Sequence, residues 1–347
     1  MIDSWGGAPG PVKDAPSLVL HIENSTRYIF SAILGFGSLR SRPFLLRGSM
    51  AYIGEIAALF TSFCWSLSAV GFSKSTQQVG SQVTNRVRVF IAMLVLILIN
   101  TVLYGEPIPL HAGASRWAWL GISGIIGLSL GDAFLFQAYQ EIGPRLGLLL
   151  LSLAPVFGAT IAWIFFGQAL TLLQTFGIVI TLGGISWVIM TRPTGGDENT
   201  RKVTGRGVLF GTLAALGQAT GLVFSQQGMS SGFSPFAGTL IRMFAAVATL
   251  WVFALFQRQA GSTITTIRRQ PVALGWIAFG ALFGPVLGVS SSLLAVQYTG
   301  IGVASTLMAL PPIFMLPISY FIFKERFGWQ AVAGTLVAMA GVALLFS

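Results

Sequence analysis

One stretch of this sequence occurs twice, and this duplication limits the possible folds more than any other feature. Residues 118–188 align with residues 275–345 at a constant shift of 157 positions and without a gap. A bias towards Gly and Leu explains part of the similarity, but it does not explain Trp, Gln and Pro pairs in one register. We therefore expect two copies of one structural unit, because an internal repeat fixes the architecture of a chain. The matched pairs include Trp119 and Trp276, Gln140 and Gln297, and Pro155 and Pro312.

Both copies are too apolar to fold in water. Hydrophobic residues make up 54% of the chain and charged residues only 9%, whereas about a quarter of the residues in a soluble domain are charged. A bilayer core of about 30 Å is crossed by a helix of about 20 apolar residues, and the alternating pattern of a membrane β-barrel is absent. We therefore predict an all-α integral membrane protein. Ten candidate transmembrane helices lie at about residues 53–72, 84–104, 116–139, 144–167, 171–190, 206–226, 234–256, 271–294, 301–323 and 328–346.

The candidate spans divide into five per half, and five is an odd number. The second half must therefore cross the membrane upside down relative to the first. We predict two inverted five-helix repeats, residues 51–190 and residues 206–347, joined by an exposed loop at residues 191–205 that contains Gly, Pro and Asp. This is the plan of secondary transporters, whose binding sites lie near the membrane midplane between the repeats.

Residues 1–49 fit neither repeat. Their most apolar part is interrupted by His21, Glu23 and Arg27, so it neither spans a membrane nor resembles the core of a signal peptide. The first candidate span begins directly after Met50. We expect translation to start at Met50, and the alternative is that the preceding residues form a disordered or surface-lying tail.

The net charge of +10 does not indicate nucleic-acid binding. The Lys and Arg residues gather at the ends of the spans, where basic residues orient helices in a membrane, and no Gly-rich phosphate loop accompanies them. Thirteen of them lie on one face and, from Met50 onwards, only Arg116 and Arg242 lie on the other. The positive-inside rule makes the basic face cytoplasmic and puts both termini outside.

The residue inventory excludes most catalytic chemistry. Cys64 is the only cysteine, and His21 and His111 are the only histidines, so we expect no intrachain disulfide, no metal site and no cofactor. An intramembrane aspartyl protease would need two aspartates within the membrane, yet only Asp132 lies in a span. We therefore do not expect an enzyme.

Few ionisable residues lie within the spans, and Asp132 is the deepest of them. A charge at the centre of a membrane helix costs about 2.5–3.5 kcal/mol on insertion scales, so such a residue usually faces a cavity or a partner. Asp132 could bind a coupling proton or a substrate amine, or it could form a structural ion pair with Arg88 or Arg242. The sequence gives these two roles equal weight. In the second copy Val289 stands at the corresponding position, so the acid serves one half only.

Arg88 and Arg242 correspond to each other in the repeat, and each stands at the head of an apolar run. For both residues we favour snorkelling to the membrane boundary over anion binding. Glu55 lies near the start of the first span, where we expect it at the membrane interface and stabilised by the N-terminus of its helix.

Uncharged residues complete the candidate site. Gln218 lies in the middle of a span between two glycines, and it is a candidate substrate contact because a buried amide needs a partner. Trp65 and Trp163 could form the aromatic walls of a cavity, although contact with lipid is an equal expectation. Pro155 and Pro312 each remove a hydrogen bond in the middle of a span and should kink their helices. Equivalent kinks in both halves would suit a central cavity and a rocking motion.

Several short motifs resemble EamA-type members of the drug/metabolite transporter superfamily. The stretch from Trp65 to Lys74 looks like the opening helix of that family. The segment Phe-Lys-Glu-Arg-Phe at residues 323–327, followed by Gly334 and by Ala-Gly-Val at residues 340–342, is similar to its last two helices. Pro312, twelve residues before Lys324, fits the same pattern.

The resemblance covers about residues 51–347 and has one departure. The first half has Gly167 and Gln168 where the family usually places a Glu. The resemblance implies a carrier of the inner (plasma) membrane, commonly an exporter of amino acids or other small metabolites. It also implies that both termini lie inside, in disagreement with the charge count.

We therefore expect a multi-pass carrier that exports a small metabolite, such as an amino acid, by alternating access. Protons could drive the export through Asp132, because no ATP-binding motif is present. The expected partners are a small-molecule substrate and the lipid bilayer, and the sequence is compatible with a homodimer. The alternative is a non-transporting membrane scaffold or sensor, although no soluble domain is attached to receive a signal. The sequence names neither the substrate nor the coupling ion.

Overall fold

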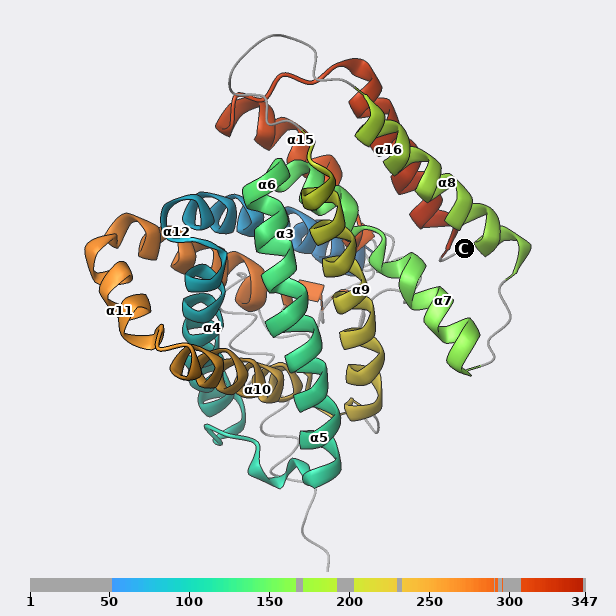
Figure 1. Ribbon diagram of the computed structural model, residues 1–347. Coiled ribbons are helices and arrows are strands. Elements are labelled where there is room, and N and C mark those ends of the chain that lie inside the picture. Colours follow the sequence, from blue (N-terminus) through green and yellow to red (C-terminus); the bar gives the residue numbers. More distant parts are fainter. Residues whose placement is uncertain are drawn as a thin grey trace, which may run out of the picture.

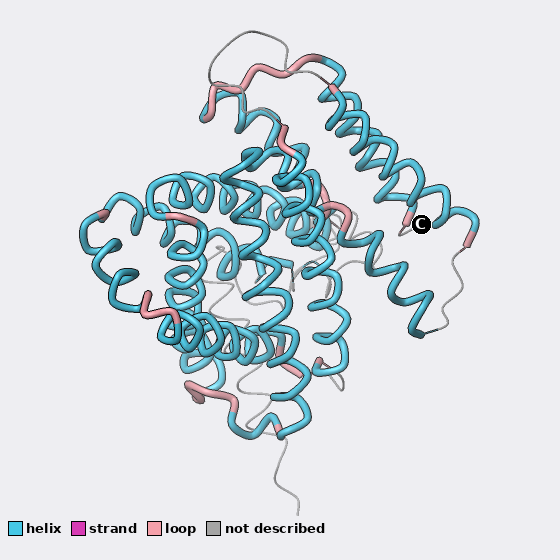
Figure 2. The backbone as a smooth tube through the Cα atoms, viewed as in Figure 1, coloured by secondary structure: helices cyan, strands magenta, loops and turns pink. Residues whose placement is uncertain are grey.

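The chain is represented by a computed structural model, which describes residues 52–166, 171–191, 203–229, 233–289, 291–292, 295 and 307–345. Every regular element in these ranges is a helix, as predicted (Figure 1), and short loops join most of them (Figure 2). Three of the sequence predictions concern residues outside these ranges: the tail at residues 1–49, most of the loop at residues 191–205, and the departure at Gly167 and Gln168.

The helical elements follow the two halves of the sequence. The first half contains α3 (Ile53–Val79), α4 (Ser81–Tyr104), η2 (Leu110–Ala112), α5 (Ala114–Ser123), η3 (Gly124–Gly131), α6 (Asp132–Leu151), α7 (Ala154–Phe166) and α8 (Leu172–Met190). The second half contains α9 (Gly205–Gly228), α10 (Pro235–Phe256), α11 (Ala260–Arg269), α12 (Pro271–Ala281), η4 (Leu282–Gly288), α15 (Pro311–Ile322) and α16 (Trp329–Leu344).

Seven helical segments of the described chain are long and apolar enough to cross a membrane. One of them runs over α5, η3 and α6, from Ala114 to Leu151, and its backbone leaves the helical conformation at Gly143. α15 and α16 are apolar but shorter, and α7 has 13 residues. A membrane protein with several apolar spans is therefore confirmed, and the count of ten stays a prediction.

Local sequence signals explain where several helices begin and end. Thr171 and Gln174 form a reciprocal capping box at the start of α8, which satisfies backbone N–H groups that have no partner within the helix. Thr204 caps α9 by accepting from the backbone N–H of Gly207 at 3.0 Å, and Ser234 caps α10. α4 ends at Gly105, whose φ of +72° is readily adopted only by glycine.

The two prolines that the repeat matches lie at helix starts. Pro155 is the second residue of α7, and Pro312 is the second residue of α15. Proline is well tolerated there, because the N–H groups of the first turn have no partner within the helix. The structure thus has breaks between helices where the sequence predicts kinks within them. A further break lies at Gly143, with φ +81°, directly before Pro144.

A π-helical turn occurs at the corresponding place in both halves. η3 and η4 are both π-helices, and the shift of 157 residues superposes their ranges to within one residue. The sequence repeat therefore extends to local backbone geometry. Such turns are rare and lie frequently at functional sites.

The α8–α16 pair brings corresponding helices of the two halves into contact. The two helices lie side by side at one edge of the molecule (Figure 1). Gly177 packs against the backbone of Gly341, and Gly184 packs against that of Gly334, so the helices are antiparallel. The shift of 157 residues matches Gly177 to Gly334 and Gly184 to Gly341, so each glycine packs against the counterpart of the other. The hydroxyl of Thr181 donates to the carbonyl oxygen of its own repeat counterpart at 3.5 Å. This is the geometry expected of an inverted repeat.

The first helix of each half packs against the third span of the other half. α3 contacts α12 and η4, and α9 contacts α5, η3 and α6. Glycines allow the close approach, since a methyl group on Gly221 would lie 2.9 Å from the Cα atom of Gly127. A methyl group on Gly217 would lie 2.9 Å from the Cα atom of Gly131. The third span of the first half is therefore in contact with helices from both halves, and Asp132 lies in this region.

Candidate functional site

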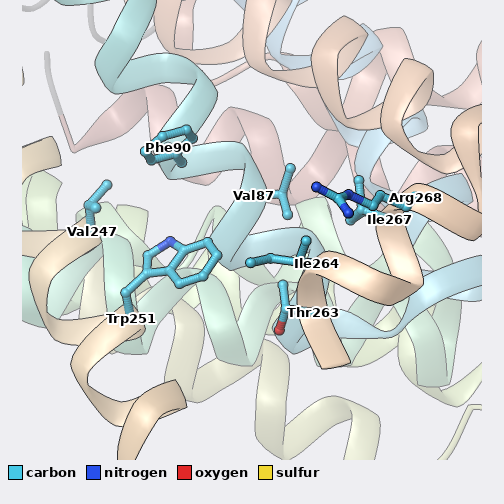
Figure 3. A pocket seen from close by; sticks show the side chains of 8 residues that line it. All are labelled: Val87, Phe90, Val247, Trp251, Thr263, Ile264, Ile267 and Arg268. Atoms are coloured by element: carbon cyan, nitrogen blue, oxygen red, sulfur yellow. The ribbon is translucent and has the colours of Figure 1, made fainter. Parts of the chain in front are cut away.

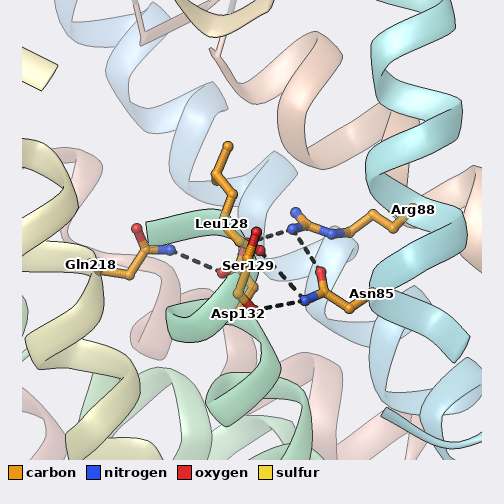
Figure 4. Close-up of polar contacts among 6 residues, drawn as sticks. All are labelled: Asn85, Arg88, Leu128, Ser129, Asp132 and Gln218. Carbon is orange, nitrogen blue, oxygen red and sulfur yellow. Dashed lines mark hydrogen bonds and ion pairs between the residues drawn. The ribbon is translucent and has the colours of Figure 1, made fainter. Parts of the chain in front are cut away.

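Asp132 is the centre of a polar cluster that joins the two halves (Figure 4). It is the first residue of α6, directly after η3, and it is only 4% exposed. Its Oδ2 atom lies 2.5 Å from Nη2 of Arg88, on α4 of the first half. Its Oδ1 atom accepts from Nε2 of Gln218, on α9 of the second half, at 3.0 Å. Both carboxylate oxygens are therefore held, one by each half.

Asn85 supports this cluster, and the sequence does not single it out. Its Oδ1 atom accepts from Nη2 of Arg88 at 3.1 Å. Its Nδ2 atom donates to the backbone oxygens of Leu128 at 3.4 Å and Ser129 at 3.1 Å, both in the π-helical turn. Asn85 thus orients the arginine and satisfies backbone groups beside Asp132. The sequence signal that could have identified Asn85 is its position three residues before Arg88, since residues three apart share one face of a helix.

Arg88 is buried rather than placed at the membrane boundary. It is 5% exposed, and its guanidinium lies over the rings of Phe72 at 5.4 Å and Phe136 at 5.2 Å. The snorkelling that the sequence favours is therefore wrong for Arg88, because an aspartate and two aromatic faces are within its reach. The ion pair with Asp132 is the second role that the sequence offered for the acid.

Arg242 approaches the same region from the second half. A side chain at Gly124 would collide with the backbone carbonyl of Arg242, so α10 crosses the third span at this glycine. Nη2 of Arg242 lies 3.5 Å from the position that a methyl group on Gly127 would occupy, and Oε1 of Gln218 lies 3.7 Å from it. The Nε atom of Arg242 is fully buried and has no hydrogen-bond partner among the described residues.

The side chain of Trp65 packs against Gly288, in the third span of the second half. A methyl group on Gly288 would lie 2.5 Å from Nε1 of Trp65. Gly288 is the repeat counterpart of Gly131, which packs against the backbone of Gln218. Trp65 is partly buried and makes no polar contact with the Asp132 cluster in the described part of the chain. The two regions therefore differ in chemistry, because one has the Gln218 amide bonded to Asp132 and the other has the Trp65 indole against Gly288.

Trp163 lies away from the Asp132 cluster. It is on α7 and is 53% exposed. No ring contact or hydrogen bond joins it to the candidate residues that the structure describes. Of the two roles that the sequence offered for this residue, contact with lipid agrees better with its exposure.

Several uncharged and charged side chains tie helices together outside this cluster. Gln140 donates to the backbone oxygen of Thr76, which joins α6 to α3. Arg145 forms an ion pair with Glu325 at 3.2 Å, between the two halves, and both side chains are more than four-fifths buried. The guanidinium of Arg145 also lies 5.0 Å from the ring centroid of Phe327.

A separate groove lies between α4, α10 and α11 (Figure 3). Its lining is largely apolar, and none of the candidate residues belongs to it. Among the described residues, no three His, Cys, Asp or Glu side chains come together to hold a metal ion. We therefore take the Asp132 cluster as the candidate site. The lining residues of the groove are Val87, Phe90, Val247, Trp251, Thr263, Ile264, Ile267 and Arg268.

Two relatives and one solved structure are similar to much of this chain. A WAT1-related, chloroplastic protein of Arabidopsis thaliana is 21% identical over 88% of this chain and 72% of its own length. An uncharacterized transporter of Synechocystis sp. is 24% identical over 68% of this chain and 74% of its own length. A solved structure titled "Crystal structure of protein" superposes with a TM-score of 0.46 at 18% identity, over 86% of this chain and 96% of its own.

The family comparison covers nearly the whole of both halves. The EamA-like transporter family matches twice, once over residues 52–190 and once over residues 205–347. The two matches correspond to the two copies in the sequence and to the exchanged helix pairs in the structure. The protein is therefore a multi-pass membrane protein and not an enzyme, and it belongs to the EamA-like transporter family.

Proposed function

We propose that this protein is a secondary transporter that exports a small metabolite across the inner membrane by alternating access of its two halves. Membership of its family makes it a membrane transporter, and the direction, the substrate and the driving ion are our proposal. One observation carries it: the buried carboxylate of Asp132 is held by Arg88 of the first half and by Gln218 of the second. A group shared by both halves is well suited to respond when the halves rearrange.

The same contacts support our proposal of proton coupling through Asp132. Protonation would remove the charge from its bonds to Arg88 and Gln218, which weakens both, because hydrogen bonds to an ionised group are about twice as strong as neutral ones. In a conformation of the carrier that moves Arg88 and Gln218 away from Asp132, the carboxylate would then bind a proton more readily. A ligand shifts a conformational equilibrium only by binding the two states differently, and this difference would couple export to protons.

The substrate that we propose is amphipathic, such as an amino acid. Its polar end would lie at Gln218, beside the Asp132 cluster, and its apolar end would lie towards Trp65 on the other half. The regions around Gln218 and Trp65 supply these opposite chemistries. We also propose that the full chain crosses the membrane ten times, as two inverted repeats of five helices. The binding sites of such carriers lie near the midplane between the repeats.

The test compares the solutes that accumulate outside cells that express the parent protein, the Asp132→Asn variant or no protein. Mass spectrometry of the medium, at matched protein levels in the membrane, should show one solute or a small group that only the parent exports. Glu141→Gln is the matched control, because Glu141 lies on the same helix and pairs with Arg206 at 3.7 Å, outside the cluster. Export should persist in this control.

Two other results would change the proposal. Equal export by the parent and by Asp132→Asn would make Asp132 structural and would remove the coupling mechanism. If the parent changes no solute in the medium, the export direction fails, and uptake of labelled solutes should be measured next.

A further inference from the structure

One arginine in the cluster lacks the carboxylate that its repeat counterpart has. Arg88 and Arg242 each stand seven residues after the first residue of their helices, α4 and α10. Arg88 pairs with Asp132, but the counterpart of Asp132 in the second half is Val289. Arg242 therefore finds no carboxylate at the corresponding place in its own repeat. Two guanidinium groups and one carboxylate leave the cluster with one surplus positive charge.

Asp132 is already occupied by other partners. Its two oxygens accept from Arg88 and from Gln218, at 2.5 Å and 3.0 Å. The buried Nε atoms of Arg88 and Arg242 both have no hydrogen-bond partner among the described residues, but only Arg88 has a carboxylate bonded to its guanidinium there. Burial of a charge is costly unless it is paired and hydrogen-bonded. The cluster is thus short of one anionic group on the side of Arg242.

The surroundings of Arg242 show where such a group would bind. The guanidinium and the amide oxygen of Gln218 both lie within 4 Å of the position that a methyl group on Gly127 would occupy. Gly127 has no side chain, and a methyl group there would be in ordinary van der Waals contact with both groups and, at 3.6 Å, with the Cα atom of Gly221. Arg242 and Gln218 come from the second half, and Gly127 comes from the first. This place therefore lies between the two halves.

We infer that the transported solute carries one carboxylate group and that Arg242 binds it. This inference rests on the proposed function and deepens it. A single carboxylate neutralises the surplus charge and accepts two parallel hydrogen bonds from the planar guanidinium. The amide oxygen of Gln218 accepts a hydrogen bond from an N–H or O–H donor on the same solute.

The test measures thermal unfolding of the purified full-length chain in detergent by tryptophan fluorescence. The probes are acetate, glycine and phosphate, with neutral acetamide and cationic glycinamide as controls, all at one ionic strength. Acetate and glycine should raise the midpoint temperature by about 2 °C or more once they exceed the dissociation constant tenfold. Acetamide and glycinamide should leave it unchanged, and a larger shift with glycine than with acetate would show that the amine is also recognised.

Three variants assign the effect to Arg242. Arg242→Gln should lose the shift with acetate, and Arg242→Lys should recover part of it. Gly127→Ala should also lose the shift, because its methyl group occupies the approach to Arg242 while its nearest contacts of 3.5–3.7 Å leave the packing intact. Arg206→Gln is the control for nonspecific charge, because the Arg206 side chain is 70% exposed. It should respond as the parent does.

The outcomes separate this inference from the proposed function. Equal shifts in the parent and in Arg242→Gln would overturn the inference, and so would a shift with phosphate alone. If the protein exports the neutral amide of its solute as fast as the carboxylic acid itself, the inference is also overturned. The proposal that the protein is an exporter would then still stand. If carboxylates stabilise the parent through Arg242 but no solute moves in proteoliposomes, the binding site stands and the transport proposal fails.

Discussion

At the scale of single residues, the Asp132–Arg88 pair tests whether the cluster serves stability or transport. Removing one partner of a buried pair leaves an uncompensated charge, which costs about 3–5 kcal/mol, whereas replacing both by apolar residues is often neutral. We therefore expect Asp132→Leu and Arg88→Met to lower the thermal midpoint strongly, and the double variant to recover most of the loss. Export should be absent in all three. Export by the double variant would make the pair purely structural.

The sequence predicts some members of this cluster and misses others for identifiable reasons. Asp132 and Gln218 stand out because a polar residue in the middle of an apolar span needs a partner. Asn85 does not stand out, because it lies near the start of a span, where polar residues are common. Arg88 has the same ambiguity, since only its packing against aromatic rings distinguishes burial from snorkelling. Trp163 is in an apolar segment whose pattern does not tell which face is exposed.

At the scale of helices, the α8–α16 contact offers a prediction with a built-in control. A methyl group on Gly184 would lie 2.8 Å from the Cα atom of Ala338, whereas one on the adjacent Gly183 would meet nothing within 4 Å. Overpacking costs about 1–3 kcal/mol, so Gly184→Ala should lower the thermal midpoint. Gly183→Ala should keep or raise it, because alanine favours a helix over glycine by about 1 kcal/mol. Equal midpoints for the two variants would contradict the close packing of α8 against α16 at Gly184.

The repeat predicts the order of these elements better than their shapes. Its register matches the two π-helical turns and the two proline positions, and the predicted five spans per half would require an inverted second half. It does not reveal that Pro155 lies at the start of a helix instead of kinking one, since proline occurs both in the first turn of a helix and at kinks within helices. The sequence also does not predict that α3 and α9 each pack against the third span of the other half. The glycines Gly217 and Gly221 indicate that another helix approaches closely, but they do not indicate which helix it is.

At the scale of the whole molecule, the two halves are joined by ionic contacts that must change if the halves move. The Arg145–Glu325 pair joins α6 to the segment after α15, and its two side chains are 16% and 13% exposed. Asp132 joins both halves through a second contact. Alternating access requires that such contacts form in one facing and break in the other. The pair at Arg145 is therefore a candidate lock for the facing seen in this structure.

Cys64 makes this lock measurable without further engineering. It is the single cysteine of the chain and is fully buried in α3, the helix that packs against α12 and η4 of the other half. A maleimide reagent should therefore label the parent slowly. Glu325→Gln removes the charge that holds Arg145, so the halves should separate more often and labelling should accelerate severalfold. Arg206→Gln removes the Arg206–Glu141 pair, which also joins the two halves, but the Arg206 side chain is 70% exposed. Exposed ion pairs contribute little to stability, so this variant should label at close to the parent rate. An unchanged rate in Glu325→Gln would show that the pair does not hold the two halves together.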